Sequence, residues 1–194
     1  MEFLAAYSVT GNLGRLFLVV CFGLGASTAV VIGKAIGEGQ SHEEVMDLSR
    51  CLLLFSILVS AGIALIALLL IPIFFAPVVF PLFKLYDQSA AIAVALAVTA
   101  FAGTPFHSCA ITSITGILRA GGDTGWAAAL DLLPQWLVGI PLTALFALLI
   151  HGGSHYWLIA IAIQCDSIVK LPLCLWRTRK DVWIHDVTLP EGRK

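Results

Sequence analysis

Five long apolar stretches dominate this chain and restrict what it can fold into. They are Leu16–Ile36, Cys51–Ile71, Ala90–Leu118, Trp126–Ile150 and Tyr156–Trp176. Each reaches the ~20 residues that a helix needs to cross a ~30 Å hydrocarbon layer. Lipid leaves backbone N–H and C=O groups without partners, and the runs are too long and continuous for barrel strands. The sequence therefore predicts an all-α polytopic membrane protein with five transmembrane helices.

Composition supports this prediction and excludes other classes of protein. Only 12% of the 194 residues are charged and 59% are hydrophobic, whereas soluble domains have about a quarter charged. The basic residues lie beside the ends of the apolar runs and form no phosphate-binding stripe, so we expect no nucleic-acid partner. The five cysteines lie in or beside apolar runs without a CxxC pair or a histidine at ligand spacing, so free thiols are favoured over disulfides or a metal.

The distribution of Lys and Arg predicts the orientation in the membrane. One side holds only Lys84, with Arg15 beside it if the first span is entered late, and the other side holds Lys34, Arg50, Arg119, Arg177, Arg179, Lys180, Arg193 and Lys194. The positive-inside rule makes the second side cytoplasmic, so the C-terminus is inside and the N-terminus outside. Met1–Gly14 lacks a basic region and a cleavage site, so it is no signal peptide. We expect an upstream span beyond this chain.

Two helical faces carry polar residues at membrane depth. On the first span, Ser8, Asn12, Arg15, Val19, Gly23 and Ser27 share one face. On the third span, Thr104, His107, Ser108, Thr112 and Thr115 do the same, and Pro105 lies among them. Such groups are costly unless they meet partners or line a wet cavity. For the Ser and Thr residues, contacts between helices are at least as favoured as a substrate path, whereas His107 favours a cavity because imidazole titrates near neutrality.

Several shorter signals predict local structure. Ser41 and Glu44 form a capping box that starts a helix, and Gly33 with Gly37 permits close helix approach. Three prolines, Pro72, Pro77 and Pro81, are expected to turn the outer end of the second span into an irregular interfacial loop.

The cytoplasmic connection between the third and fourth spans is very short. It contains Arg119, Gly121, Gly122, Asp123 and Thr124, in which the glycines allow a tight turn and Asp123 and Thr124 can cap the next helix. In the fifth span, Asp166 precedes Lys170 by four residues, which favours a structural ion pair. For Asp131, a cap, a water-facing position or a helix contact is favoured over a proton relay.

The motif Leu-Arg-Ala-Gly-Gly-Asp-Thr at 118–124 resembles the multidrug and toxic compound extrusion (MATE) transporters, as do Leu130-Asp131 and the stretch from Trp136 to Leu142. Ala5–Val9, Gly23–Ala26, Ile32–Gly37 and the tail 175–188 fit the same order. The resemblance covers nearly the whole chain. It implies two six-helix lobes around a central cavity, of which this chain would be helices eight to twelve. Residues 1–188 would then be a partial C-terminal lobe and residues 189–194 a short cytoplasmic tail.

The resemblance implies a multi-pass plasma-membrane antiporter that exports amphipathic or cationic small molecules and is driven by sodium or protons. Its partners would be the lipid bilayer, the N-terminal lobe and the first helix of the C-terminal lobe. No coupling carboxylate can be carried over, because the stretch from Ser89 to Leu118 has no Asp or Glu. No other cofactor is expected, and the chain alone is expected to be inactive. As candidates for the cavity wall we take Asn12, Arg15, Thr104, His107, Ser108 and Gln135.

The residues also bear on two functions other than transport. An enzyme is disfavoured, because the chain has no HExxH, GxSxG or phosphate loop and because His107 and Cys109 diverge by ~200° on a helix. A helical membrane protein that only assembles with partners is the remaining alternative. It differs from a transporter in that its polar faces would be buried against neighbouring helices.

Overall fold

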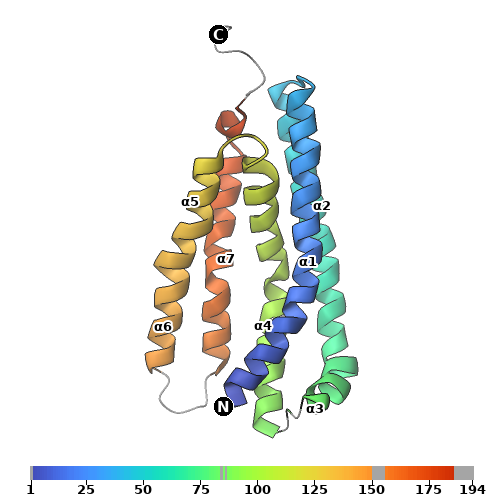
Figure 1. Cartoon of the computed structure of the whole chain (residues 1–194), viewed down its shortest axis with the longest axis vertical. Helices are drawn as coiled ribbons and strands as arrows, with labels where there is room; N and C mark the ends of the chain where they lie inside the picture. Colours follow the sequence, from blue (N-terminus) through green and yellow to red (C-terminus); the bar gives the residue numbers. More distant parts are fainter. Residues whose placement is uncertain (1, 84, 86, 150–155, 186–194) are drawn as a thin grey trace.

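The computed structural model describes residues 2–83, 85, 87–149 and 156–185, and within them it contains helices and no strand (Figure 1). The expected tail 189–194 lies outside the described residues. The described residues form seven α-helices: α1 (Glu2–Gly37), α2 (His42–Leu70), α3 (Phe80–Leu82), α4 (Asp87–Ile111), α5 (Thr124–Pro134), α6 (Ile140–Leu149) and α7 (Tyr156–Thr178). Three π-helical segments, η1 (Ile71–Val79), η2 (Thr112–Leu118) and η3 (Gln135–Gly139), continue α2, α4 and α5 without a break, and a 3₁₀ turn, η4 (Asp181–Trp183), follows α7.

Four helical stretches of the described chain are long and apolar enough to cross a membrane. They are Ala6–Gly37, His42–Leu82, Ser89–Leu118 and Thr124–Phe146. Four of the five predicted spans are thus confirmed, and the all-helical polytopic fold with them. The fifth, α7, has 23 residues and lies alongside the others, but it carries Asp166 and Lys170 and is not among the four. Its insertion stays a prediction.

Helix α4 lies at the centre of the bundle. It packs against α1, α2 and α7, while α5, η3 and α6 pack against the far side of α7 (Figure 1). Large apolar side chains such as Leu58, Leu65 and Leu137 remain exposed on the outer surfaces. A water-soluble domain would not leave so much apolar surface uncovered, whereas lipid covers it at no cost.

The ends of the bundle agree with the predicted topology. The connection after α1, the connection after η2 and the end of α7 lie together at one end, and α1 begins at the opposite end (Figure 1). Lys34, Arg50, Arg119 and Arg177 therefore share one end of the bundle. That this end is cytoplasmic stays a prediction based on their charge.

Of the local structures predicted from the sequence, one is confirmed and one is wrong. The Ser41 capping box is confirmed, because Ser41 Oγ accepts from the Glu44 amide at 3.3 Å and Glu44 Oε2 accepts from the Ser41 amide at 2.9 Å. The prediction of an irregular loop at Pro72, Pro77 and Pro81 was wrong, because these residues lie in the helical segments η1 and α3. Wider π-helical turns accommodate prolines that lack an N–H donor, and Phe75 and Phe80 of this segment are buried.

Close helix approach occurs at glycines other than the predicted pair. A Cβ on Gly33 or Gly37 would meet nothing within 4 Å, and both residues are exposed. A Cβ on Gly116 would instead lie 2.8 Å from Cβ of Thr28 and 2.9 Å from the Gly25 carbonyl oxygen. Spacing identified a small-residue face, but the neighbour that uses such a face is set by tertiary packing.

The five cysteines are free in the structure. Cys21, Cys109 and Cys174 are buried as small apolar side chains, and Cys165 is half-buried. Cys51 is exposed on α2.

Candidate functional site

The polar face of α1 is not covered by any other described helix. Ser8, Asn12, Arg15, Gly23 and Ser27 are all exposed, whereas the opposite face of the same helix, with Ala6, Thr10, Cys21, Thr28 and Ile32, is buried against the bundle. A span with lipid all round it would carry apolar residues on its exposed face. This face is therefore suited to water, a ligand or another protein segment.

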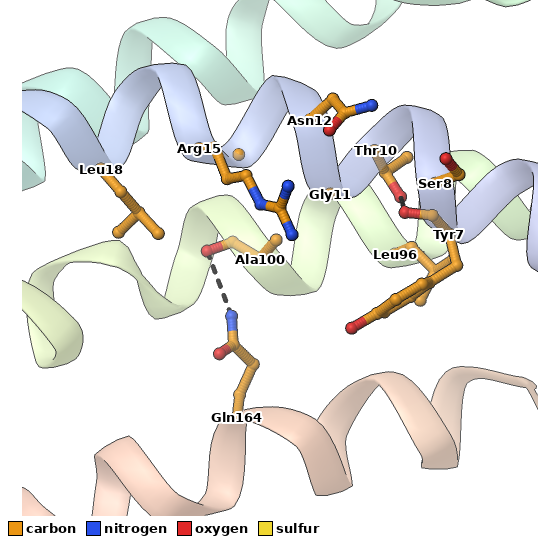
Figure 2. A pocket seen from close by; sticks show the side chains of 11 residues that line it. Tyr7, Ser8, Thr10, Gly11, Asn12, Arg15, Leu18, Leu96, Ala100 and Gln164 are labelled. Carbon is orange, nitrogen blue, oxygen red and sulfur yellow. Dashed lines mark hydrogen bonds between the residues drawn. The ribbon is translucent and has the colours of Figure 1, made fainter. Parts of the chain in front are cut away.

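A groove of about 430 Å³ runs along this part of α1 (Figure 2). Helix α1 forms one side of it, and α4 and α7 form the other. We call it the α1 groove, and its lining residues are Tyr7, Ser8, Thr10, Gly11, Asn12, Gly14, Arg15, Leu18, Leu96, Ala100 and Gln164. Two of the predicted wall residues, Asn12 and Arg15, thus lie in one groove. No Asp or Glu is among the described residues that line it.

Arg15 is the only charged side chain among these lining residues. Figure 2 shows the Arg15 and Tyr7 side chains pointing from α1 toward the side where Gln164 lies, while Ser8 and Asn12 point away from Gln164. No ion pair joins Arg15 to any residue in the described part of the chain. The described residues that line the groove therefore include one basic side chain and no acidic one.

Gln164 of α7 was not predicted as a site residue. Its side-chain amide donates to the Ala100 carbonyl oxygen at 3.4 Å (Figure 2). Gly103 makes this possible, because a Cβ there would lie 2.8 Å from the Gln164 Nε2 atom. A glutamine within an apolar run was a signal in the sequence, but its partner lies 64 residues away.

The structure does not place Thr104 and Ser108 on the groove, contrary to the predicted cavity wall. Both are buried, and Ser108 Oγ lies 2.8 Å from the Ser56 hydroxyl of α2. Ser56 also lies 2.6 Å from the Thr112 hydroxyl. The polar face of the third span therefore serves mainly as a hydrogen-bonded contact between α2 and α4, the other alternative that the sequence left open.

His107 and Gln135 also lie away from the α1 groove. His107 is half-buried and faces α7, where its Nδ1 atom is 3.1 Å from the Ser167 hydroxyl. Gln135 is exposed at the start of η3. Neither residue is among those that line the groove.

Lys170 lies between two carboxylates. Its Nζ atom is 3.3 Å from Asp166 Oδ2, the spacing that the sequence favoured, and 3.5 Å from Asp131 Oδ1 of α5. Asp131 is also 3.7 Å from Arg119, and Asp166 accepts from Ser167 at 3.4 Å. Two cations balance two anions here, so this cluster joins α5 to α7 without an unpaired charge.

Asp123 has a different partner from the one expected. It precedes α5 but its side chain makes no capping hydrogen bond. Instead its carboxylate accepts from Arg177 Nε at 2.7 Å and lies 2.6 Å from Arg177 Nη2, with both side chains at most 10% exposed. The Arg177 guanidinium also lies 4.9 Å from the Trp126 ring centroid. Thr124, the first residue of α5, is exposed.

The residues that follow α7 close over the turn between η2 and α5. Trp183 is fully buried, and the His185 amide donates to the Gly121 carbonyl oxygen at 2.8 Å. Gly122 has φ +89°, a conformation that favours glycine, and it pairs with Ile184 in an isolated bridge. We call this contact between Gly121–Asp123 and Trp183–His185 the terminal cap. It is a structural element, since the buried Trp183 ring and the His185–Gly121 hydrogen bond hold its two parts together.

Comparison with known proteins identifies the family. A profile of the MatE family matches residues 2–145. A curated protein of Bacillus subtilis (strain 168) described as "Uncharacterized transporter YisQ" is 28% identical over 182 residues, which cover 91% of this chain and 37% of that protein. No solved structure matches the chain. The profile covers most of the chain and agrees with the resemblance found in the sequence, so this protein belongs to the MatE family of membrane transporters.

Proposed function

We propose that the chain forms part of a secondary active transporter that exports amphipathic or cationic small molecules, with the α1 groove on the substrate path. The observation that carries this proposal is the uncovered polar face of α1, with Asn12 and Arg15 in a groove that no described helix fills. Only a water-filled path or another protein segment makes such a face affordable in a membrane.

The position of Arg15 along α1 suggests which end of the path it serves. Arg15 lies 19 residues before Lys34, which corresponds to about 28 Å along a helix. That distance is close to the ~30 Å thickness of the hydrocarbon core. With Lys34 at the cytoplasmic surface of the plasma membrane, the Arg15 part of the groove opens toward the outside.

Coupling to sodium or protons is proposed to come from carboxylates of the longer protein that are not in this chain, and the described residues that line the groove include no Asp or Glu. The chain spans 37% of the length of its curated relative, so transport is proposed for a longer protein that includes it. By itself the chain is proposed not to transport. Gradient-driven efflux from vesicles that contain only this chain would contradict that part of the proposal.

Thiol labelling tests the path against the alternative of a purely assembling membrane protein. On a background without the five native cysteines, Asn12→Cys, Ser108→Cys and Thr112→Cys are exposed to a membrane-impermeant reagent in the proposed complete transporter. We expect Asn12→Cys to react and to be protected by transported substrate. Ser108→Cys and Thr112→Cys should stay unreactive, because these positions of α4 and η2 are buried against α2. If all three cysteines fail to react in the absence of substrate, a membrane protein that only assembles with partners would be favoured over a transporter.

A further inference from the structure

We infer that the α1 groove binds the anionic oxygen group of an amphipathic molecule through Arg15. This inference rests on the proposed function for its role in transport, and it narrows the substrate class to molecules that carry a carboxylate, a sulfonate or a phosphate. Of the two classes named in the proposed function, the inference favours amphipathic molecules with such a group over cations that lack one.

Charge is the first argument. Arg15 has no ion-pair partner in the described part of the chain, and no acidic side chain of that part lines the groove. Lys170 of α7 differs from Arg15, since it is shared by Asp131 and Asp166. Low-dielectric walls strengthen the field of an unpaired charge, so an anion is attracted into the groove and an ammonium group is repelled.

Chemistry is the second argument. A guanidinium offers a planar set of N–H donors that matches the two oxygens of a carboxylate or phosphate. Figure 2 shows Arg15 directed toward the side of the groove where Gln164 and the Tyr7 ring lie. Leu18, Leu96 and Ala100 supply apolar wall next to it. One charged donor beside an aromatic and an aliphatic surface fits a molecule with an apolar body and one anionic end.

The anionic group has two possible sources. At about 28 Å from Lys34, Arg15 is near the level of lipid headgroups, so a phospholipid phosphate supplies the same chemistry as a free amphipathic acid. The test therefore needs lipid with phosphate and lipid without it.

The experiment measures binding of two fluorescent probes that share one body and differ in charge, pyrene butyrate and a pyrene butyl trimethylammonium. The chain is placed in nanodiscs of phosphatidylcholine or of uncharged galactolipid, with empty nanodiscs as the blank for partition into lipid. We expect the wild-type chain to bind the carboxylate probe about tenfold or more tightly than the ammonium probe, which corresponds to about 1.4 kcal/mol.

Variants connect this preference to Arg15. Arg15→Gln is expected to bring the ratio of the two affinities to near one, and Arg15→Glu to reverse it. Lys34→Gln is the matched control, because it removes one positive charge from the same helix outside the groove, and it is expected to keep the wild-type ratio. Circular dichroism and size-exclusion elution verify that each variant is folded. Equal binding of the two probes by the wild-type chain, or an unchanged ratio in Arg15→Gln, would overturn the inference.

The two lipids identify the source of the anion. If a lipid phosphate occupies the site, the wild-type chain binds the carboxylate probe several-fold more tightly in galactolipid than in phosphatidylcholine, and Arg15→Gln shows no such difference. If a free ligand occupies it, the two lipids give equal affinity. Transport by the complete protein is measured separately. Gradient-driven transport without the anion preference would refute this inference alone, and the preference without any transport would refute the proposed function alone.

Discussion

Substitution of Gly121 by alanine should open the terminal cap. Gly121 is not among the residues with positive φ, so alanine fits its backbone and only the space around it matters. An added Cβ would lie 2.7 Å from Cζ3 and 2.7 Å from the backbone oxygen of Trp183, and it would meet Cε3 of the same ring. Because a backbone atom is among these contacts, a change of side-chain rotamer cannot relieve all of them.

The expected cost follows from the contacts. Forcing an extra methyl group into a packed core costs about 1–3 kcal/mol. Complete loss of a buried tryptophan costs about 3–5 kcal/mol, which sets the upper limit if Trp183 leaves its site. We therefore expect the free energy of opening the cap to fall by about 1–3 kcal/mol.

Trypsin cleavage after Lys180 is the assay, because that bond lies between α7 and the cap. When opening and closing are fast relative to cleavage, the cleavage rate follows the population of the open form. A change of 1–3 kcal/mol then corresponds to cleavage about 5- to 150-fold faster in Gly121→Ala. Mass spectrometry identifies the cut between Lys180 and Asp181.

The matched control is Gly125→Ala, where an added Cβ would meet nothing within 4 Å. This variant is expected to be cleaved at the wild-type rate. In a Trp183→Ala background the cap is already weakened, so Gly121→Ala should add little. If Gly121→Ala is cleaved no faster than Gly125→Ala, the packing of Trp183 on this turn is not what holds the cap closed.

The remaining predictions concern the free energy of unfolding, measured by SDS titration with circular dichroism. Asp123→Ala should lower this free energy by about 3–5 kcal/mol, because it leaves the buried Arg177 side chain unpaired. Asp47→Ala removes the partner of Arg50 in an exposed ion pair and should cost less than ~1 kcal/mol. Equal costs for the two variants would contradict the burial of the Asp123–Arg177 pair. Ser56→Ala should cost about 1–3 kcal/mol because two buried hydroxyls lose their partner, and no loss would show that they find others. Gly116→Ala should cost about 1–3 kcal/mol, because the added methyl group would contact Thr28. Gly33→Ala should be neutral or slightly stabilising, because nothing lies within 4 Å of an added Cβ there. A larger cost at Gly33 than at Gly116 would support the predicted close helix approach at Gly33.

Features that depend on neighbours in sequence were predictable. Ser41 and Glu44 of the capping box are three positions apart, and Asp166 and Lys170 are four positions apart. Helical geometry alone therefore brings these groups together. The apolar runs predicted the helical polytopic fold because a bilayer of fixed thickness demands helices of a minimum length. The motif at 118–124 indicated the family, which the profile match confirms.

Partners that are far apart in sequence were not predictable. Periodicity shows which residues share a face, but it does not show which helix covers that face. The two polar faces looked alike in the sequence, yet Ser108 meets Ser56 of α2, 52 residues away, whereas Asn12 and Arg15 are exposed along the α1 groove. In the same way Asp123, placed to cap α5, pairs with Arg177, 54 residues away.

By itself the sequence determined three properties of this protein: its membrane environment, its helices and its family. These are set by composition, by the length of the apolar runs and by local motifs. Only the tertiary structure decided that one polar face is a contact between helices and that the other lines an open groove, where the Arg15 guanidinium has no ion-pair partner among the described residues. The physical reason is that the cost of a polar group in a membrane depends on what lies against it, and that neighbour is chosen by the packing of whole helices.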